Sequence, residues 1–162
     1  EYPHLEAEFA IEQEPLGTGG GIQLAASLAK EKNVFVLNGD TLFKVNLKNL
    51  SDHHYARQAA CTLSLKPMQQ FDRYGVVELN EQQHIISFKE KQFYETGLIN
   101  GGVYALNVNQ FTSLPFPDKF SFENDYLEVY YQQQDMFGFV SEGYFIDIGI
   151  PQDYQRAQTE LA

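Results

Sequence analysis

The feature that most constrains the fold is a short apolar run, VFVL at residues 34–37, which ends in the polar residues Asn38, Gly39 and Asp40. A continuous apolar run with polar ends is typical of a strand buried on both faces, as in a parallel sheet. The polar residues would then lie at the carboxyl end of the strand, where open α/β sheets bind ligands. The run therefore predicts an α/β domain with a ligand site at this end.

The rest of the chain alternates between patterns typical of strands and patterns typical of helices. Strands are expected at 6–13, 59–65 and 97–106, as a hairpin at 74–79 and 84–91, and as short segments at 136–140 and 143–149. Helices are expected from Thr18, as the cap, to about residue 30, and at 47–58 with Asn46 as the cap. Further helices are expected at 109–114, at 122–134 and at 151–161, the last beginning with Pro151. This order favours a single domain, residues 1–162, with a three-layer α/β core, a mixed sheet and an inserted β-hairpin region.

Net charge limits the partners of this chain. The formal net charge is -11, which repels nucleic-acid backbones and anionic membranes. We therefore expect no nucleic-acid polymer and no membrane as partners, and no apolar run approaches the ~20 residues that span a bilayer. A phosphate site on such a chain would need a divalent cation, backbone N–H groups or a few placed lysines.

Cysteine and histidine offer little chemistry. Cys61 is the single cysteine, so no intrachain disulfide forms, which fits a reducing cytoplasm. Its place in an apolar strand favours a small buried hydrophobe over a nucleophile. His53 and His54 are neighbours on an expected helix, so they point in different directions and do not form a metal-binding pair.

The segment PLGTGGG, residues 15–21, has four glycines in five positions. One interpretation is a close approach of the backbone to a flat or anionic ligand, with N–H groups at a helix start. The other is a tight loop. The residues alone leave both open.

Two carboxylates are candidates for a metal site. Asp40 follows the apolar run, and Asp147 lies between Ile146 and Ile148 in an apolar strand. A buried, unpaired carboxylate costs several kcal/mol, so it needs a cation or strong donors. A metal ion shared by both aspartates would meet that need. The alternatives are that Asp40 caps a turn and that Asp147 points to solvent.

The segment FKEK, residues 88–91, ends an expected strand with alternating charge. Lys91 could neutralise a phosphate, and Glu90 could accept hydrogen bonds from sugar hydroxyls. A solvated strand end with a surface ion pair is the alternative. Gly101 and Gly102 lie inside another strand, which they weaken unless something must approach the backbone closely.

Six segments, taken together and in this order, resemble a known family: EQEPLGTGGGI, FVLNGDTLF, RYGVVEL, FKEK, GLINGGVY and GYFIDIGIPQDY. They are similar to bacterial sugar-1-phosphate nucleotidyltransferases, and most of all to the D-glycero-D-manno-heptose 1-phosphate guanylyltransferases. The resemblance implies a Rossmann-like α/β nucleotidyltransferase fold. It also implies a reaction in which a sugar 1-phosphate attacks the α-phosphorus of a nucleoside triphosphate, with GTP favoured, to give a nucleotide sugar and pyrophosphate with Mg²⁺ as cofactor.

The resemblance also assigns roles to residues of this sequence. Asp40 and Asp147 would be the Mg²⁺ ligands and, with Lys91, the catalytic residues. The positions on the nucleotide side are Glu12, Leu16, Gly17, Thr18, Asn38 and Gly39. The positions on the sugar-phosphate side are Tyr74, Gly75, Glu90, Lys91, Asn100, Gly101 and Glu123.

One part of the family pattern does not occur in this sequence. The family opens with a strand and a loop of the form G-G-x-G-T-R, followed by a P-K pair, that grips the triphosphate. The chain is therefore expected to be the C-terminal two-thirds of the fold, with neighbouring strand edges and apolar surface exposed.

Three interpretations follow. The chain is a piece of an active enzyme; or it is a short inactive relative that binds a nucleotide sugar or a partner subunit; or it is a GT-A-like glycosyltransferase whose NGD segment binds a metal ion. The sequence leaves the oligomeric state open, a homo-oligomer included.

Overall fold

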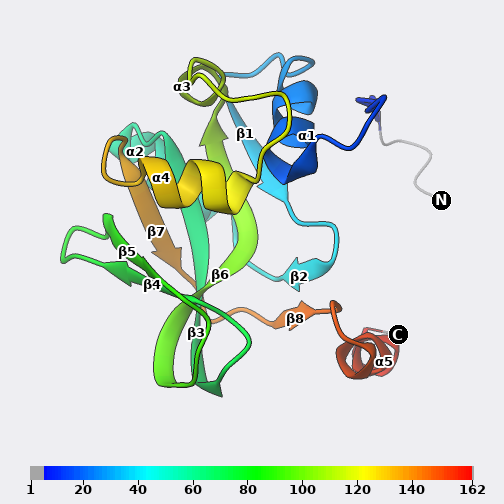
Figure 1. Ribbon diagram of the computed structural model, residues 1–162. Coiled ribbons are helices and arrows are strands. Elements are labelled where there is room, and N and C mark those ends of the chain that lie inside the picture. Colours follow the sequence, from blue (N-terminus) through cyan, green and yellow to red (C-terminus); the bar gives the residue numbers. More distant parts are fainter. Residues whose placement is uncertain (1–5, 162) are drawn as a thin grey trace.

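The computed structural model describes residues 6–161, which form a mixed α/β fold (Figure 1). The strands are β1 Asn33–Leu37, β2 Thr41–Phe43, β3 Cys61–Phe71, β4 Val76–Leu79, β5 Ile85–Lys89, β6 Tyr94–Asn107, β7 Met136–Val140 and β8 Phe145–Asp147. The helices are α1 Gly17–Ala26, α2 Leu47–Arg57, α3 Val108–Thr112, the π-helix η1 Phe122–Leu127, α4 Glu128–Tyr130 and α5 Pro151–Glu160. None of these helices is long and apolar enough to cross a membrane.

The main sheet has the strand order β1-β6-β3-β7. The central strand β6 runs antiparallel to both β1 and β3, while β3 and β7 are parallel. The sheet is therefore mixed, as expected. Two smaller sheets accompany it, the pair β2-β8 and the hairpin β4-β5.

The strand formed by the apolar run of residues 34–37 is not buried on both faces, and this expectation was wrong. Within residues 6–161, β1 pairs only with β6, and it does so in the antiparallel direction. Its other edge has no partner strand among those residues. Phe35 and Leu37 share the less buried face of the strand, where Leu37 is 60% exposed and Phe35 is 39% exposed. The expected exposure of a strand edge and of apolar side chains is confirmed at this strand.

Helices cover both faces of the sheet. One face carries the larger core, in which Tyr104 and Leu106 of β6 pack with Phe111, Phe122 and Tyr126, and these come from α3 and η1. The opposite face packs Val103 and Ala105 against Leu50 of α2. Alternate residues of β6 thus point to opposite faces, as the pleat of a strand requires. Cys61 is fully buried in the larger core, as expected, and burial raises the pKa of its thiol.

Local sequence signals correctly predicted two helices, α2 and α5, and the β4-β5 hairpin. Asn46 caps α2, because its side chain accepts a hydrogen bond from the N–H of Asn49 at 3.0 Å. Pro151 occupies the first turn of α5. The expected hairpin is present as β4-β5, and its turn is stabilised by Asn80, whose side chain accepts hydrogen bonds from two backbone N–H groups.

Two other local expectations were wrong. Residues 6–13 form no strand, and Phe9 is 82% exposed, because no strand of the described chain lies beside them. Thr18 does not cap α1: that helix begins after Leu16, which makes no capping bond with its side chain. It also ends at Ala26, four residues earlier than expected.

Candidate active site

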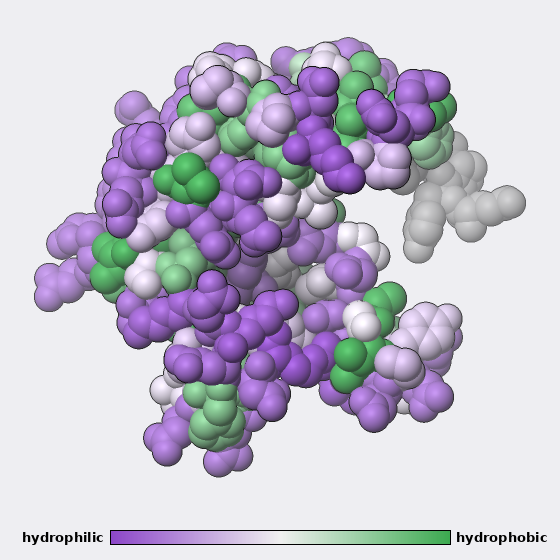
Figure 2. Space-filling view, in the orientation of Figure 1, coloured by the Kyte–Doolittle hydropathy of each residue, from purple (hydrophilic) through white to green (hydrophobic). Residues whose placement is uncertain are grey.

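A deep cleft, with a volume of about 930 Å³, brings together most of the residues expected on the sugar-phosphate side. Its walls come from the loop before β2, the turn between β3 and β4, the loop after β5, the π-helix η1 and the end of β8. The face drawn in Figure 2 is hollowed between its upper and lower parts, and hydrophilic residues surround much of the hollow. The polar side chains that line the cleft are Asn38, Asp40, Thr41, Arg73, Tyr74, Lys89, Glu90, Lys91, Asn100, Ser121, Glu123, Asn124, Glu128 and Asp147.

Asp147, the last residue of β8, and Asp40, in the turn just before β2, both line this cleft. In the β2-β8 pair, Thr41 is the partner of Asp147. The backbone N–H of Ile148 donates to the carbonyl oxygen of Asp40 at 2.9 Å. The two aspartates, far apart in the sequence, are therefore held on hydrogen-bonded segments and line the same cleft.

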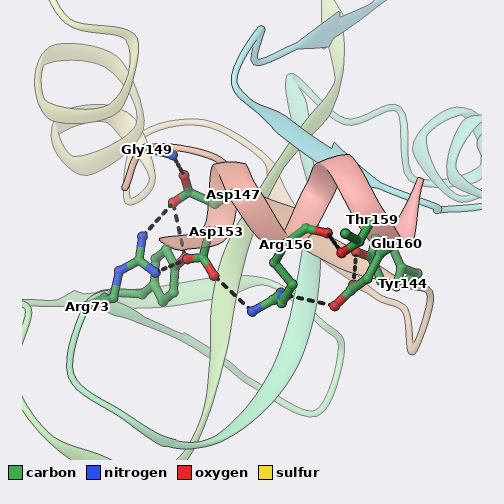
Figure 3. Close-up of polar contacts among 9 residues, drawn as sticks. Arg73, Tyr144, Asp147, Gly149, Asp153, Arg156, Thr159 and Glu160 are labelled. Atoms are coloured by element: carbon green, nitrogen blue, oxygen red, sulfur yellow. Dashed lines mark hydrogen bonds and ion pairs between the residues drawn. The ribbon is translucent and has the colours of Figure 1, made fainter. Parts of the chain in front are cut away.

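The carboxylate of Asp147 has three partners in the fold (Figure 3). Oδ1 accepts a hydrogen bond from the N–H of Gly149 at 2.7 Å. Oδ2 accepts one from the hydroxyl of Tyr74 at 3.0 Å and lies 3.6 Å from Nη2 of Arg73. Arg73 thus supplies part of the positive charge that the position of Asp147 in an apolar strand was expected to require.

The neighbours of Asp147 have shifted pKa values. Burial, followed by the negative charge of Asp147, raises the pKa of Tyr74 to about 12. Its hydroxyl therefore keeps its proton at neutral pH and acts as a donor. The pKa of Arg73 is raised, chiefly by its hydrogen bond to Asp153.

The donors at this edge fit a Mg²⁺ ion that binds together with phosphates. Across residues 6–161, no three His, Cys, Asp or Glu side chains form a group that could hold a metal ion by themselves. Mg²⁺ commonly keeps several waters and uses one or two carboxylates plus substrate phosphates. Asp40 and Asp147 match that requirement, since carboxylate oxygens accept more than one contact each.

The residues expected on the sugar-phosphate side differ in what they do. Tyr74, Gly75, Glu90, Lys91, Asn100 and Glu123 all line the cleft. Asn100 is fixed by its own strand, because its side chain donates to the hydroxyl of Tyr104 at 2.8 Å and accepts from the N–H of Gly102 at 3.1 Å. Gly101 does not line the cleft: a Cβ there would lie 2.3 Å from the ring of Phe43, so packing explains this glycine.

On the nucleotide side, Asn38 lines the cleft, whereas Glu12, Leu16, Gly17 and Thr18 do not. Gly39 lines a second groove, of about 430 Å³, between β2-β8 and α5.

The Gly-rich segment packs against residues 118–122 rather than facing the cleft. A Cβ at Gly19 would lie 2.2 Å from the ring of Phe120, and one at Gly17, which has a φ of +75°, would lie 2.6 Å from the carbonyl oxygen of Phe120. A Cβ at Gly20 would lie 2.5 Å from the carbonyl oxygen of Asp118. Close packing between two segments of the chain is therefore a sufficient reason for these three glycines.

Sequence reasoning missed three residues of the cleft region. Arg73 and Asp153 form an ion pair beside Asp147, although both lie in segments that carried the family resemblance. Glu128 lines the cleft as well, and burial, with Glu90 and Glu123 nearby, raises the pKa of its carboxyl. Ion pairs between remote segments leave no pattern in a single sequence, so no local signal could have found the first two.

Comparison with known proteins gives consistent matches. Residues 2–162 match the family model described as nucleotidyl transferase. The chain is 48% identical, over 99% of its length, to the D-glycero-alpha-D-manno-heptose 1-phosphate guanylyltransferase of Aneurinibacillus thermoaerophilus, and covers 69% of that protein. Its identity to the protein of the same name from Campylobacter jejuni subsp. jejuni is 42%, over 95% of this chain and 67% of that protein.

Solved structures agree with these matches. HddC from Yersinia pseudotuberculosis, complexed with GMP-PN, superposes with a TM-score of 0.85 at 35% identity. The match covers 96% of this chain and 67% of HddC. The chain thus spans about two thirds of the length of these relatives.

Proposed function

Because this chain belongs to the nucleotidyl transferase family, we propose that it forms the sugar-phosphate part of the active site of a guanylyltransferase. The reaction proposed is GTP plus a heptose or mannose 1-phosphate, giving a GDP-sugar and pyrophosphate. The names of the two heptose relatives support guanine and a heptose. A mannose-1-phosphate guanylyltransferase of Mycobacterium tuberculosis, 31% identical over 97% of this chain and 45% of that protein, supports mannose. The GMP-PN in the HddC complex supports a guanine nucleotide.

The observation that carries this proposal is that Asp40 and Asp147, from two hydrogen-bonded segments, line one cleft that Lys91 also lines. Two carboxylates with a lysine nearby suit substrates that bring several phosphate charges and a divalent cation. A cleft with carboxylates but no such cation site would instead suit cationic ligands.

The chain's own residues position the substrates and neutralise charge in the proposed reaction. Lys91 neutralises the phosphate of the sugar substrate, whose oxygen attacks the α-phosphorus of the nucleotide. Glu90 and Glu123 accept hydrogen bonds from sugar hydroxyls, and Asn100 is held ready for the same sugar by Tyr104. Asp40 and Asp147 would hold Mg²⁺, which would supply positive charge to neutralise the phosphates. Catalysis of this kind rests on positioning and electrostatics rather than on covalent work by the protein.

On the nucleotide side, the resemblance places Glu12 and Gly17 near the base and counts Leu16 and Thr18 among the nucleotide-binding positions. In the family, a G-G-x-G-T-R loop grips the triphosphate. We propose the activity for a protein that includes such a loop, with the three-layer Rossmann-like fold of the family. A role in cytoplasmic nucleotide-sugar supply for polysaccharide synthesis is part of the same proposal.

A pyrophosphate-release assay tests this function. The chain of residues 1–162 and a version extended upstream to the length of the relatives are each incubated with Mg²⁺, one nucleoside triphosphate, and heptose or mannose 1-phosphate. We expect the extended chain to release pyrophosphate and form a nucleotide sugar fastest with GTP.

The other interpretations give different results in the same assay. Absence of pyrophosphate with every nucleotide would overturn the proposal. An inactive relative would bind GDP-sugar without turnover. A glycosyltransferase would consume GDP-sugar only when an acceptor is supplied and would release no pyrophosphate.

A further inference from the structure

Arg73, in the turn between β3 and β4, lies between two carboxylates from other parts of the chain (Figure 3). Its Nη1 donates to Oδ2 of Asp153, at the start of α5, and its Nη2 lies 3.6 Å from Oδ2 of Asp147, at the end of β8. The side chain of Arg73 is 36% exposed and that of Asp153 only 13%. The guanidinium thus joins the turn to both β8 and α5.

Asp153 has a second, more exposed partner within α5. Its second oxygen, Oδ1, accepts a hydrogen bond from Nη1 of Arg156 at 2.8 Å, and its position in the first turn of α5 suits a carboxylate. Within α5 only Ala157 is buried, so apolar packing alone does little to fix this helix. The ion pair between Arg73 and Asp153 is therefore a major link between α5 and the turn.

The same turn carries Tyr74, the next residue, which donates to Oδ2 of Asp147 at 3.0 Å. One anchor at Asp153 thereby places two donors, the Tyr74 hydroxyl and the Arg73 guanidinium, beside the same carboxylate oxygen. The backbone N–H of Gly149 holds the other oxygen.

We propose that Arg73 and Asp153 are positioning residues for the guanylyl transfer: their ion pair holds the β3–β4 turn on the β8–α5 segment and so fixes the orientation of the Asp147 carboxylate at the cleft. The catalytic consequence rests on the proposed function. The structural part of the inference is that Asp153 holds Arg73 beside Asp147, and this part does not depend on the proposed function.

The chain contains a matched control. Arg156 also pairs with Asp153 and, through Nε, with Glu160 at 3.0 Å. It does not contact Asp147. Arg156→Gln therefore removes a positive charge and an ion pair from the same aspartate, without touching the carboxylate at the cleft.

The test measures kcat and KM of the extended chain with GTP and the sugar 1-phosphate. Arg73→Gln and Asp153→Asn should each lower kcat about tenfold, with KM for GTP changed less than about twofold, as expected for the loss of an interaction that matters in the transition state. The double variant should be no slower than either single variant, because the two residues act as one unit. Arg73→Lys should recover part of kcat, and Arg156→Gln should stay within about twofold of the unchanged protein.

A second readout needs no activity. Thermal unfolding of metal-free protein is measured for Arg73→Gln, Asp147→Asn and the double variant, with and without Asp153→Asn. We expect the effects of Arg73→Gln and Asp147→Asn to be coupled, and the coupling to shrink when Asp153 is replaced. A kcat unchanged in Arg73→Gln, equal losses in Arg73→Gln and Arg156→Gln, or additive unfolding effects would overturn the inference. If the unchanged protein formed no nucleotide sugar, the proposed function would fail, and the unfolding cycle would still decide the link between Arg73 and Asp147.

Discussion

Asp147 shows why a carboxylate can lie in an apolar strand. Its two neighbours in sequence are isoleucines, yet its oxygens accept from the N–H of Gly149 and the hydroxyl of Tyr74, with Arg73 nearby. These donors offset the cost of removing the charge from water. A cation at the cleft would therefore meet a carboxylate that is already oriented.

Asp147→Asn in the extended chain should abolish turnover while the fold survives. The amide keeps an acceptor oxygen for one of the two donors, Gly149 or Tyr74, but it loses the negative charge that a metal ion requires. We expect kcat to fall by ~100-fold or more, on the scale seen when one charge-stabilising group is removed. Steady-state kinetics over a Mg²⁺ series, with circular dichroism as the control for folding, checks this. Unchanged turnover with unchanged Mg²⁺ dependence would remove Asp147 from the site.

Thr18 serves a different element from the one it was expected to cap. Its hydroxyl accepts from the N–H of Phe122 at 2.8 Å and donates to Oε2 of Glu123 at 3.1 Å. It thus satisfies a free N–H in the first turn of η1 from a remote part of the chain. It also ties Glu123, which lines the cleft, to the Gly-rich segment.

Thr18→Val should lower the free energy of unfolding by about 1–2 kcal/mol, because it leaves the N–H of Phe122 without its acceptor. Thr18→Ser is the matched control, since it keeps the hydroxyl, and its cost should be well below that of valine. Urea denaturation of the three proteins gives the comparison. Equal losses in the two variants would mean that the methyl group of Thr18 matters and its hydrogen bonds do not.

At the scale of elements, α1 depends on glycine because of what it touches. Its residues Gly19 and Gly20 lie against Phe120 and Asp118, so the two segments approach more closely than any side chain would allow. Alanine normally favours a helix by about 1 kcal/mol over glycine. Here the collision of a methyl group with an aromatic ring outweighs that gain.

Gly19→Ala should therefore destabilise the protein, by about 1–3 kcal/mol, as overpacking of a core does. Gly39→Ala is a control for stability alone, because a Cβ at that position has no atom within 4 Å. Thermal unfolding should show a clear loss for Gly19→Ala and little change for Gly39→Ala. A neutral Gly19→Ala would show that Phe120 moves aside easily and that packing does not explain the glycine.

The elements that were predicted correctly depend on local signals. Asn46 caps its helix with its own side chain, and the Asn80 turn joins two alternating strands. The errors depend on partners. Residues 6–13 have a strand pattern, but no strand of residues 6–161 lies beside them, and the VFVL run lies at an edge of the sheet. A pattern reports which side chains could be buried, whereas burial itself requires a second element.

At the scale of the whole molecule, the sequence indicated which residues would lie together. It did not indicate all the contacts that hold these residues in place. Asp40, Glu90, Lys91, Asn100 and Asp147, which the resemblance singled out, line one cleft. The ion pair of Arg73 with Asp153 depends instead on the packing of α5 beside the β3–β4 turn. Only the folded chain brings those two segments together.

Two histidines on α2 make the stability of the whole fold depend on pH. His54 is buried, with Nδ1 2.9 Å from the hydroxyl of Thr62 and Nε2 3.1 Å from Oδ1 of Asn33. His53 packs its ring edge-on against Phe139, and its buried Nε2 has no hydrogen-bond partner within the described part of the chain. Burial lowers the pKa of each to about 4 from an ordinary 6.5, with Arg57 and His54 adding to the effect at His53.

The sign of the dependence follows from these values. Between pH 6.5 and 4 the unfolded chain binds protons at both histidines while the folded chain does not, so the free energy of unfolding falls as the pH falls. The slope is at most about 1.4 kcal/mol per pH unit for each histidine, and less for His53, which is only half-buried and partly screened by solvent. Above pH 7 these two groups contribute no dependence.

Urea denaturation at several pH values from 7.5 to 4.5 measures this slope in the unchanged protein and in His54→Gln. The carboxylates titrate in both proteins, so the difference between the two slopes isolates His54. We expect the variant to be less stable at pH 7.5, because glutamine cannot keep both hydrogen bonds in the same geometry, and yet to lose less stability on acidification. Identical slopes would show that His54 becomes protonated in the folded state as readily as in the unfolded state, and that its burial does not make the fold sensitive to acid.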